Sequence, residues 1–224
     1  MRVHLSSARD PRPAALRTPL RHAVLFDHDG TLIDSLDLVV AATNAVLAQH
    51  GAPPHGKAEI VAGMVLPTGR RMGALLGVAE PRAQAALADA FYIAAADNAG
   101  LAKPYSGMPE LIARLRHRGV ALGCVTNNQG ALVRAILRTH AIDLRVWGEE
   151  DIPTVKPSPS GLLLAARQLG MPPSACTYVG DSLVDAQAAR AAGMAAIGVT
   201  WGTHRREELA GRFDRLVDDP GEIG

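Results

Sequence analysis

The sequence predicts an α/β protein with a doubly wound, mostly parallel Rossmann-like sheet and a small all-helical cap domain inserted after the first strand. Two observations carry this prediction. From residue 21 onward, short continuous apolar runs alternate with helical patterns, which is typical of crossover units in a parallel sheet. The stretch from residue 35 to 103 interrupts that alternation with helical patterns and no convincing strand. A chain of 224 residues is long enough for one large domain or two small ones.

Composition excludes several classes of protein. Hydrophobic residues make up 48% of the chain and charged residues 20%, so the chain as a whole is not disordered. Aromatic residues are only 4%, which requires an Ala, Val, Leu and Ile core and disfavours a base-stacking platform. The net charge of +1 gives no basic footprint for nucleic acid, and two cysteines cannot form a disulfide scaffold or a Cys₄ zinc site. No apolar stretch reaches the ~18 residues of a membrane span. We therefore expect neither nucleic acid nor membrane as a partner.

The first twenty residues differ from the rest. They hold four Arg, three Pro and one acidic residue, without hydrophobic periodicity and without the apolar segment of a secretory signal. An Arg-rich, acid-poor leader can also be a transit peptide, but the prolines oppose an amphipathic helix. We therefore expect residues 1–20 to be a disordered leader of a cytoplasmic protein.

The strands are predicted from apolar runs that end in turn signals. Ala23–Phe26 runs directly into Asp27-His28-Asp29-Gly30, as expected of a strand buried on both faces. Similar runs follow at Val120–Val125, Leu144–Trp147, Cys176–Val179 and Ala195–Val199, with a weaker one at Arg215–Val217. The helical patterns between them cover Met108–Arg118, Gly130–Thr139, Ser160–Leu169, Leu183–Ala192 and Arg205–Leu209. Residues 21–34 and 104–224 are therefore predicted to form the sheet domain.

The insert at residues 35–103 is predicted to be the cap domain. Leu36–His50 has a helical pattern with Asp34 or Ser35 as N-cap, and the Ala-rich segment Pro81–Asn98 has another. Shorter helices are expected between them, separated by breaks at Gly51, Pro53-Pro54, Gly63, Pro67 and Gly77.

Polar residues follow the predicted strands at their carboxyl ends, where open parallel sheets bind ligands. Asp27 and Asp29, two residues apart on an extended segment, point the same way, and like charges that close need a cation or a shared proton. Thr126-Asn127-Asn128 and Lys156-Pro157 follow two further strands.

Asp181 and Asp185 follow the strand at Cys176, and if a helix begins near Asp181 the two positions share one face of it. Oxygen ligands without His or Cys suit Mg²⁺, which commonly partners phosphate, and Lys and Thr bind phosphate oxygens. The pattern therefore predicts metal-assisted phosphoryl transfer.

Each residue has a structural reading as well. Asp27 and Asp29 are common turn residues before a glycine, Thr126 and Asp34 are common N-caps, and an acid such as Asp185 is favoured in the first turn of a helix. Lys156 alone fits a solvated loop. Only the occurrence of all these motifs together, each at the end of a predicted strand, favours a phosphoryl-transfer site over these structural readings.

The conjunction resembles a known family. Four segments of this chain resemble, in order, the four motifs of the haloacid dehalogenase superfamily. They are residues 26–35 (Phe-Asp-His-Asp-Gly-Thr-Leu-Ile-Asp-Ser), 126–128, 156–157 and 180–185 (Gly-Asp-Ser-Leu-Val-Asp). The resemblance extends from about Arg21 to the C-terminus. The helical insert and the tail at residues 200–202 and 216–220 look like the subgroup that includes phosphoglycolate phosphatase.

The resemblance implies a role for each residue. Asp27 would be the nucleophile that forms an aspartyl-phosphate, and Asp29 the general acid and then the base. Thr126, with the Asn127 amide, would hold the phosphoryl group, and Lys156 would neutralise charge on it and on Asp27.

It also implies a Mg²⁺ site of Asp27, the Asp29 backbone carbonyl and Asp181, with Asp185 supporting directly or through water. One departure is His28, where the family usually has an apolar residue. We expect its side chain to point opposite to the two aspartates.

The expected function is a Mg²⁺-dependent phosphatase for a small phosphorylated metabolite, with 2-phosphoglycolate as the candidate substrate, acting as a monomer or homodimer. Arg70 and Arg71 are the substrate-binding candidates in the insert, against a reading as a solvated helix face. The alternatives are a sugar phosphomutase of the same fold and, in another class, a phospho-accepting signalling receiver, whose motif order differs. A dehalogenase would not need the extra acids, and a P-loop enzyme is excluded because Gly-x₄-Gly-Lys-Ser/Thr is absent.

Overall fold

A computed structural model describes residues 23–64 and 66–224, so the predicted leader lies outside the described residues. A six-stranded sheet forms the centre, in the order β5-β4-β1-β6-β7-β8, and every neighbouring pair in it is parallel. Its strands are β1 (Ala23–Phe26), β4 (Ala121–Val125), β5 (Arg145–Trp147), β6 (Cys176–Gly180), β7 (Ala195–Val199) and β8 (Arg215–Val217). The chain moves from β1 through β4 to β5 and then returns to the other side of β1 with β6. This reversal creates a crevice at the carboxyl ends of β4, β1 and β6, where ligands bind in such sheets.

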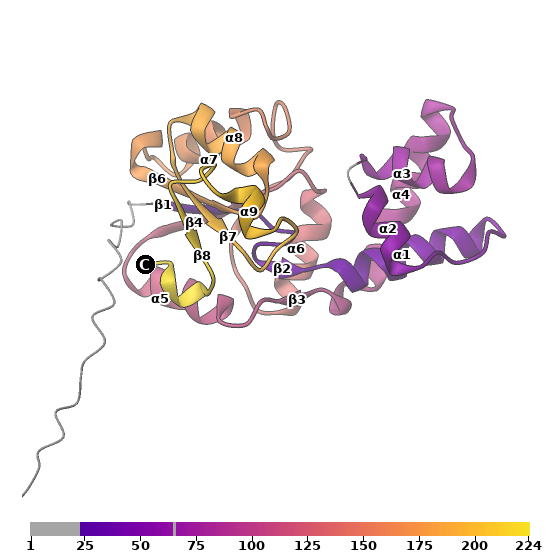
Figure 1. Ribbon diagram of the computed structural model, residues 1–224, viewed down its shortest axis with the longest axis horizontal. Helices are drawn as coiled ribbons and strands as arrows, with labels where there is room; N and C mark the ends of the chain where they lie inside the picture. Colours follow the sequence, from indigo (N-terminus) through magenta and orange to yellow (C-terminus); the bar gives the residue numbers. More distant parts are fainter. Residues whose placement is uncertain (1–22, 65) are drawn as a thin grey trace, which may run out of the picture.

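Helices cover both faces of the sheet (Figure 1). These are α5 (Met108–His117), α6 (Gly130–Thr139), α7 (Ser160–Gln168), α8 (Leu183–Ala192) and α9 (Arg206–Leu209), with short 3₁₀ turns at η2 (Pro173–Ala175) and η3 (Pro220–Glu222). The predicted fold class is confirmed, and no predicted end of a strand or long helix is displaced by more than one residue.

The core has two layers, one on each side of the sheet. Val24 and Phe26 face α5 and α6, whereas Leu25 and Tyr178 face α7 and α8. Adjacent residues of β1 therefore enter opposite layers, which explains why its sequence is continuously apolar. Burying one such side chain completely contributes roughly 1.5–3 kcal/mol.

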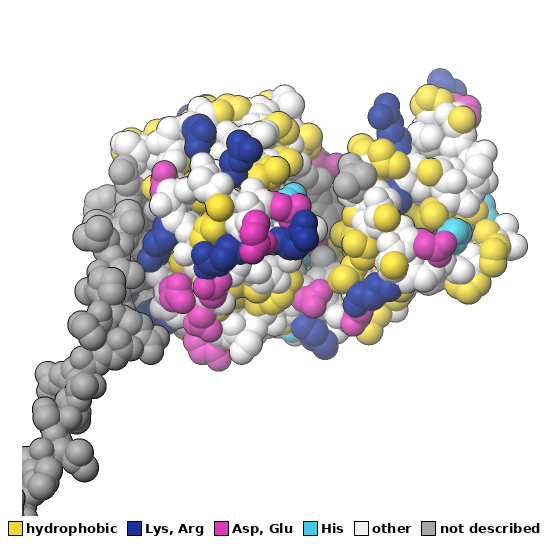
Figure 2. Space-filling model, viewed as in Figure 1, with side chains coloured by type: hydrophobic (Ala, Val, Ile, Leu, Met, Phe, Trp, Pro, Cys, Tyr) yellow, Lys and Arg dark blue, Asp and Glu magenta, His cyan; other side chains and the backbone are white. Residues whose placement is uncertain are grey.

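The insert forms four helices that lie to one side of the sheet body (Figure 1). They are α1 (Leu36–Gln49), α2 (Lys57–Gly63), α3 (Thr68–Leu76) and α4 (Pro81–Asp97), followed by the 3₁₀ turn η1 (Ala99–Leu101). Of the two N-cap candidates, Ser35 takes the N-cap position of α1, and the preceding Asp34 accepts from the Leu36 N–H through Oδ1 at 3.2 Å. Gly77 ends α3 at a φ of 69°, a conformation that favours glycine. Figure 2 shows a notch between these helices and the sheet body. The division of the chain into a separate cap domain stays a prediction.

The expectation that residues 35–103 hold no strand is wrong at one position. Lys103 belongs to β3 (Lys103–Pro104), which pairs antiparallel with β2 (Ile33–Asp34). A two-residue strand is too short to show any periodicity, so sequence patterning misses it. This ribbon joins the two points where the chain leaves and re-enters the sheet body.

Candidate active site

Three buried carboxylates converge at the carboxyl edge of the sheet. Asp27 follows β1, Asp181 follows β6, and Asp185 lies in the first turn of α8. One carboxylate oxygen from each lies within 4.8 Å of the other two. The convergence that the strand ends predict is therefore present.

Lys156 is buried against this cluster. Its Nζ donates to Asp27 Oδ1 at 2.7 Å, to Asp185 Oδ1 at 2.6 Å and to the Tyr178 hydroxyl at 2.8 Å. Burial disfavours the ammonium, but Asp185 and Asp27 outweigh it and raise the pKa of Lys156 well above its usual range. The lysine is therefore charged, and the solvated-loop reading is wrong.

Both carboxylate oxygens of Asp185 already accept hydrogen bonds. Its Oδ1 binds Lys156, and its Oδ2 accepts from the Ser182 backbone N–H at 3.1 Å and the Ser182 hydroxyl at 2.6 Å, forming a capping box at the start of α8. The carboxylate is thus both a first-turn helix acid and a counter-ion that holds Lys156. The sequence leaves open whether Asp185 supports a metal directly or through water, and this geometry favours the indirect arrangement.

The remaining donors fit a divalent cation. Asp27 Oδ2 accepts no hydrogen bond from the described residues, while Asp181 accepts from the Thr31 hydroxyl at 3.3 Å and the Thr203 N–H at 2.6 Å. Burial and the neighbouring carboxylates raise the pKa of Asp27 and of Asp181. Three carboxylates against one ammonium leave negative charge that a cation with oxygen ligands would balance.

Gly30 allows the two acidic segments to approach. Its φ is 76°, and a Cβ at this position would lie 2.3 Å from Asp181 Oδ2. Any side chain would therefore displace the Asp181 carboxylate as well as strain the backbone.

Asp29 lies outside the Lys156 cluster and is held separately. The Ser35 hydroxyl donates to Oδ1 at 2.5 Å, and the Asn128 amide donates to Oδ2 at 3.0 Å. Burial raises the pKa of Asp29, but His28, Ser35 and Asn128 together hold it well below its usual range. Its side chain is 32% exposed against 12% for Asp27, so it is the more accessible of the two aspartates.

The expected orientation of His28 is wrong with respect to Asp29. Its ring is fully buried, yet Nδ1 lies 3.1 Å from Asp29 Oδ1. The expectation assumed that strand alternation continues through residue 29. The strand ends at Phe26, and the backbone then turns, with the Leu32 and Ile33 N–H groups both donating to the His28 carbonyl.

Thr126 and Asn127 have different surroundings. Thr126 Oγ1 accepts from the Asn128 N–H at 3.0 Å, which leaves its hydroxyl proton for a ligand. The helix α6 takes Gln129 as its N-cap, so Thr126 is not a helix cap. The Asn127 amide donates to the Lys156 carbonyl at 2.9 Å and accepts from the Lys156 N–H at 2.7 Å. The Asn127 side chain therefore positions the Lys156 backbone.

The structure distinguishes the two arginines of α3. Arg70 is exposed, whereas Arg71 is only 6% exposed and stacks on the Phe91 ring at 5.0 Å. Its Nε has no hydrogen bond, and no carboxylate of the described residues forms an ion pair with it. Burial lowers the pKa of Arg71, while the charges of Tyr92 and Asp29 oppose that change.

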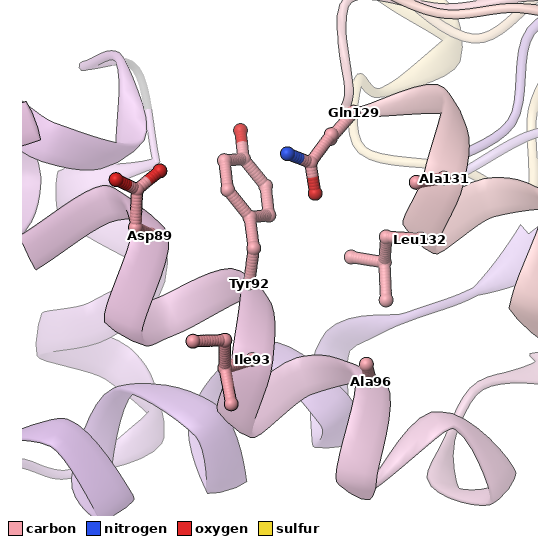
Figure 3. A pocket seen from close by; sticks show the side chains of 7 residues that line it. All are labelled: Asp89, Tyr92, Ile93, Ala96, Gln129, Ala131 and Leu132. Carbon is pink, nitrogen blue, oxygen red and sulfur yellow. The ribbon is translucent and has the colours of Figure 1, made fainter. Parts of the chain in front are cut away.

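A cavity of about 380 Å³ lies between α4 and α6. Figure 3 shows Tyr92 and Gln129 directed into it from opposite walls, and the Tyr92 hydroxyl reaches Glu149 Oε1 at 3.4 Å. Gln129 directly follows Asn128, which binds Asp29, so this cavity lies beside the loop after β4, and none of its lining residues belongs to the acid cluster.

Sequence reasoning missed several partners of the predicted residues. Tyr178 binds Lys156 from within β6, and Asn128 and Ser35 bind Asp29. The available signal for Tyr178 was a phenol in a buried strand, since a buried tyrosine hydroxyl usually has a hydrogen-bond partner. Asn128 and Ser35 adjoin the recognised motifs, but only the three-dimensional structure shows which way their side chains point.

Comparison with known proteins gives a consistent result. The family model of haloacid dehalogenase-like hydrolases matches residues 24–199. A phosphoglycolate phosphatase of Xylella fastidiosa is 35% identical over 88% of this chain and 89% of that protein. An N-acetylmuramic acid 6-phosphate phosphatase of Pseudomonas aeruginosa is 34% identical over 90% of this chain and 92% of that protein. The structure of CbbY from Rhodobacter sphaeroides in complex with phosphate has a TM-score of 0.78 and 27% identity, and covers 91% of this chain and 96% of that one.

Proposed function

Since this chain belongs to the haloacid dehalogenase-like hydrolase family, we propose that its acid cluster hydrolyses a small phosphate monoester through an aspartyl-phosphate intermediate. Phosphoric monoester hydrolysis is the activity that both curated relatives are named for. The observation that carries the mechanism is the buried Lys156 bridge, because it engages Asp27 Oδ1 and leaves Oδ2 to react.

In the first step Asp27 Oδ2 attacks phosphorus and the ester P–O bond breaks. Lys156 and the Thr126 hydroxyl hold the phosphoryl oxygens, and Asp29 gives a proton to the departing alkoxide. Asp29 is ionised while its three neighbours hold it. A phosphate dianion placed beside it favours its protonated form, which prepares it to act as an acid.

In the second step Asp29, now a carboxylate, takes a proton from water. The resulting hydroxide attacks phosphorus, the bond from Asp27 to phosphorus breaks, and inorganic phosphate leaves with Asp27 restored. The low pKa that its neighbours impose keeps Asp29 ionised for this role.

A divalent cation, which we propose is Mg²⁺, would supply charge stabilisation for the transferring phosphoryl group. Asp27, the Asp29 backbone carbonyl and Asp181 would hold it, and Asp185 would act through Lys156. Hard oxygen donors and an excess of negative charge support Mg²⁺ over a metal that prefers nitrogen or sulfur.

We propose that Arg71, rather than Arg70, reads a carboxylate of the substrate. A buried guanidinium without an acidic partner is costly unless a ligand supplies the anion. Phosphoglycolate and N-acetylmuramic acid 6-phosphate, for which the two relatives are named, are both phosphate monoesters that carry a carboxylate. The substrate class is therefore a phosphorylated carboxylic acid, with 2-phosphoglycolate as the first to test.

The test compares Arg71→Ala with Arg70→Ala on 2-phosphoglycolate and on p-nitrophenyl phosphate, which has no carboxylate. A charge-assisted contact worth about 1.5–3 kcal/mol should raise KM for 2-phosphoglycolate ~10- to 100-fold in Arg71→Ala. The KM for p-nitrophenyl phosphate should stay unchanged, as should both KM values in Arg70→Ala. Equal changes on the two substrates would refute the carboxylate contact while leaving the phosphatase assignment intact.

Release of inorganic phosphate separates this function from the phosphomutase alternative, in which the phosphoryl group returns to a sugar. Among the described residues, no helix combines the length and apolar character needed to cross a bilayer. A cytoplasmic location and a monomeric or homodimeric state stay predictions.

A further inference from the structure

His28 is a buried imidazole that the proposed reaction does not yet use. Its side chain is fully buried, and neither ring nitrogen has a well-aligned hydrogen bond from the described residues. Within residues 23–64 and 66–224, the charged group that lies against it is the Asp29 carboxylate, with Nδ1 3.1 Å from Oδ1. A polar ring is costly in such a place unless it serves a neighbouring group.

The geometry points to His28 as a positioning residue for the acid–base Asp29, a role that rests on the proposed function of that aspartate. Oδ1 of Asp29 lies between the His28 ring and the Ser35 hydroxyl, while Oδ2 binds the Asn128 amide. The two oxygens therefore have distinct surroundings, and rotation of the carboxylate by half a turn exchanges them. His28 restricts that rotation by favouring one oxygen on its side.

The three groups around Asp29 come from three separate segments. Ser35 precedes α1 at the start of the insert, and Asn128 lies in the loop after β4. His28 directly follows Asp27 at the end of the central strand, and the backbone bonds to its carbonyl from Leu32 and Ile33, at 3.0 Å each, fix its position. Because His28 is covalently adjacent to Asp27, its contact with Asp29 couples the placement of the proton-transferring carboxylate to that of the nucleophile.

The imidazole acts here as a hydrogen-bond donor through Nδ1–H. A small rotation of the ring or of the carboxylate aligns this N–H with Oδ1 across the existing 3.1 Å. An apolar side chain fills the same space but leaves Oδ1 to Ser35 alone. His28 thus places a donor against Asp29 Oδ1 where an apolar side chain would offer none.

The test compares His28→Asn, whose amide N–H takes the place of Nδ1–H, with His28→Leu and His28→Phe, which keep apolar bulk without a donor. The assay is kcat for 2-phosphoglycolate, whose alkoxide needs a proton to leave, and for p-nitrophenyl phosphate, whose phenoxide needs less help. We expect the two apolar variants to lose at least tenfold more kcat on the first substrate than on the second. His28→Asn should restore most of this ratio.

The same substitutions in an Asp29→Asn background isolate the route of the effect. If His28 works through Asp29, His28→Leu should change kcat of Asp29→Asn less than twofold on either substrate. Equal losses on both substrates in the wild-type background, or the same loss in the Asp29→Asn background, would make His28 a packing residue. If the wild-type protein hydrolyses neither ester, the proposed function fails instead. His28→Phe, which keeps a planar ring, serves if His28→Leu does not fold.

Discussion

Replacing Lys156 by Met should destabilise the protein strongly, because the lysine is the counter-ion of two buried carboxylates. Its Nζ lies 2.7 Å from Asp27 Oδ1 and 2.6 Å from Asp185 Oδ1, and its side chain is only 4% exposed. Removing one member of a buried ion pair costs about 3–5 kcal/mol, since the other charge stays behind unpaired. For a chain of this size each kcal/mol lowers Tm by about 2–4 °C, so Tm should fall by about 6–20 °C.

The loss should depend on pH, and its sign follows from the carboxylates. Burial raises the pKa of Asp27, and Lys156 opposes that rise, so the variant raises it further. An acid whose pKa is higher in the folded than in the unfolded state destabilises the fold fully above its folded pKa and not at all below its unfolded pKa. The pKa of Lys156 itself is raised, so its stabilising effect is constant from pH 5 to 8. The cost of Lys156→Met should therefore be larger at pH 8 than at pH 5.

The assay is denaturant unfolding in EDTA at both pH values, which removes any metal contribution. Lys103→Met, at an exposed lysine, is the matched control and should change the free energy of unfolding by no more than about 0.5 kcal/mol. Adding Asp185→Asn to Lys156→Met removes one unpaired charge and should recover about 1–3 kcal/mol. A loss below about 1 kcal/mol, or one that is the same at both pH values, would refute the view that Lys156 balances buried ionised carboxylates.

Three further predictions concern the acids and the metal. Asp27→Asn should lower kcat at least ~10³-fold on any phosphate ester. Asp29→Asn should lose far more kcat on 2-phosphoglycolate than on p-nitrophenyl phosphate and should show a burst of product release on the latter. Equal losses of kcat on the two substrates would mean that Asp29 is not the general acid. Because the pKa values of Asp27 and Asp181 are raised, the metal-free fold loses stability as pH rises through them. Mg²⁺ should therefore raise Tm more at pH 8 than at pH 5. Activity should vanish in excess EDTA, and full activity in EDTA would contradict the metal site. Gly30→Ala should lower both Tm and Mg²⁺ affinity, since its Cβ would meet Asp181 Oδ2 at 2.3 Å, and unchanged metal affinity would argue against Asp181 as a ligand.

Sequence reasoning was strongest where one physical rule decides the outcome. Continuous apolar runs require strands buried on both faces, and β1 lies between β4 and β6 as a central strand of such a sheet must. Parallel strands end at one edge, so residues that directly follow β1 and β6 meet without any knowledge of the loops. Asp27 and Asp181 could be predicted on this basis, and they lie together.

The remainder depends on contacts between distant segments. The sequence offered Arg70 and Arg71 equally, because adjacent helix positions differ only in the face they occupy, and the position of Phe91 decides which is buried. Asp185 could be predicted near the metal, but its binding to Lys156 and Ser182 depends on the path of the loop before Lys156. His28 was misjudged because alternation applies only while the chain remains a strand, and β1 is four residues long.

Two unbalanced charges define how this site would select a substrate. The Asp27, Asp181 and Asp185 carboxylates outnumber Lys156, while Arg71 is a buried cation that forms no ion pair within the described residues. A divalent cation balances the first, and a substrate carboxylate balances the second. Neither imbalance is removed by the other, because no ion pair joins Arg71 to the acids in the described part of the chain. On the proposed function, a bound phosphate ester that lacks a carboxylate leaves the charge of Arg71 unpaired. Selectivity for phosphorylated carboxylic acids therefore arises from the cost of that unpaired buried charge as much as from the contact that the correct substrate adds.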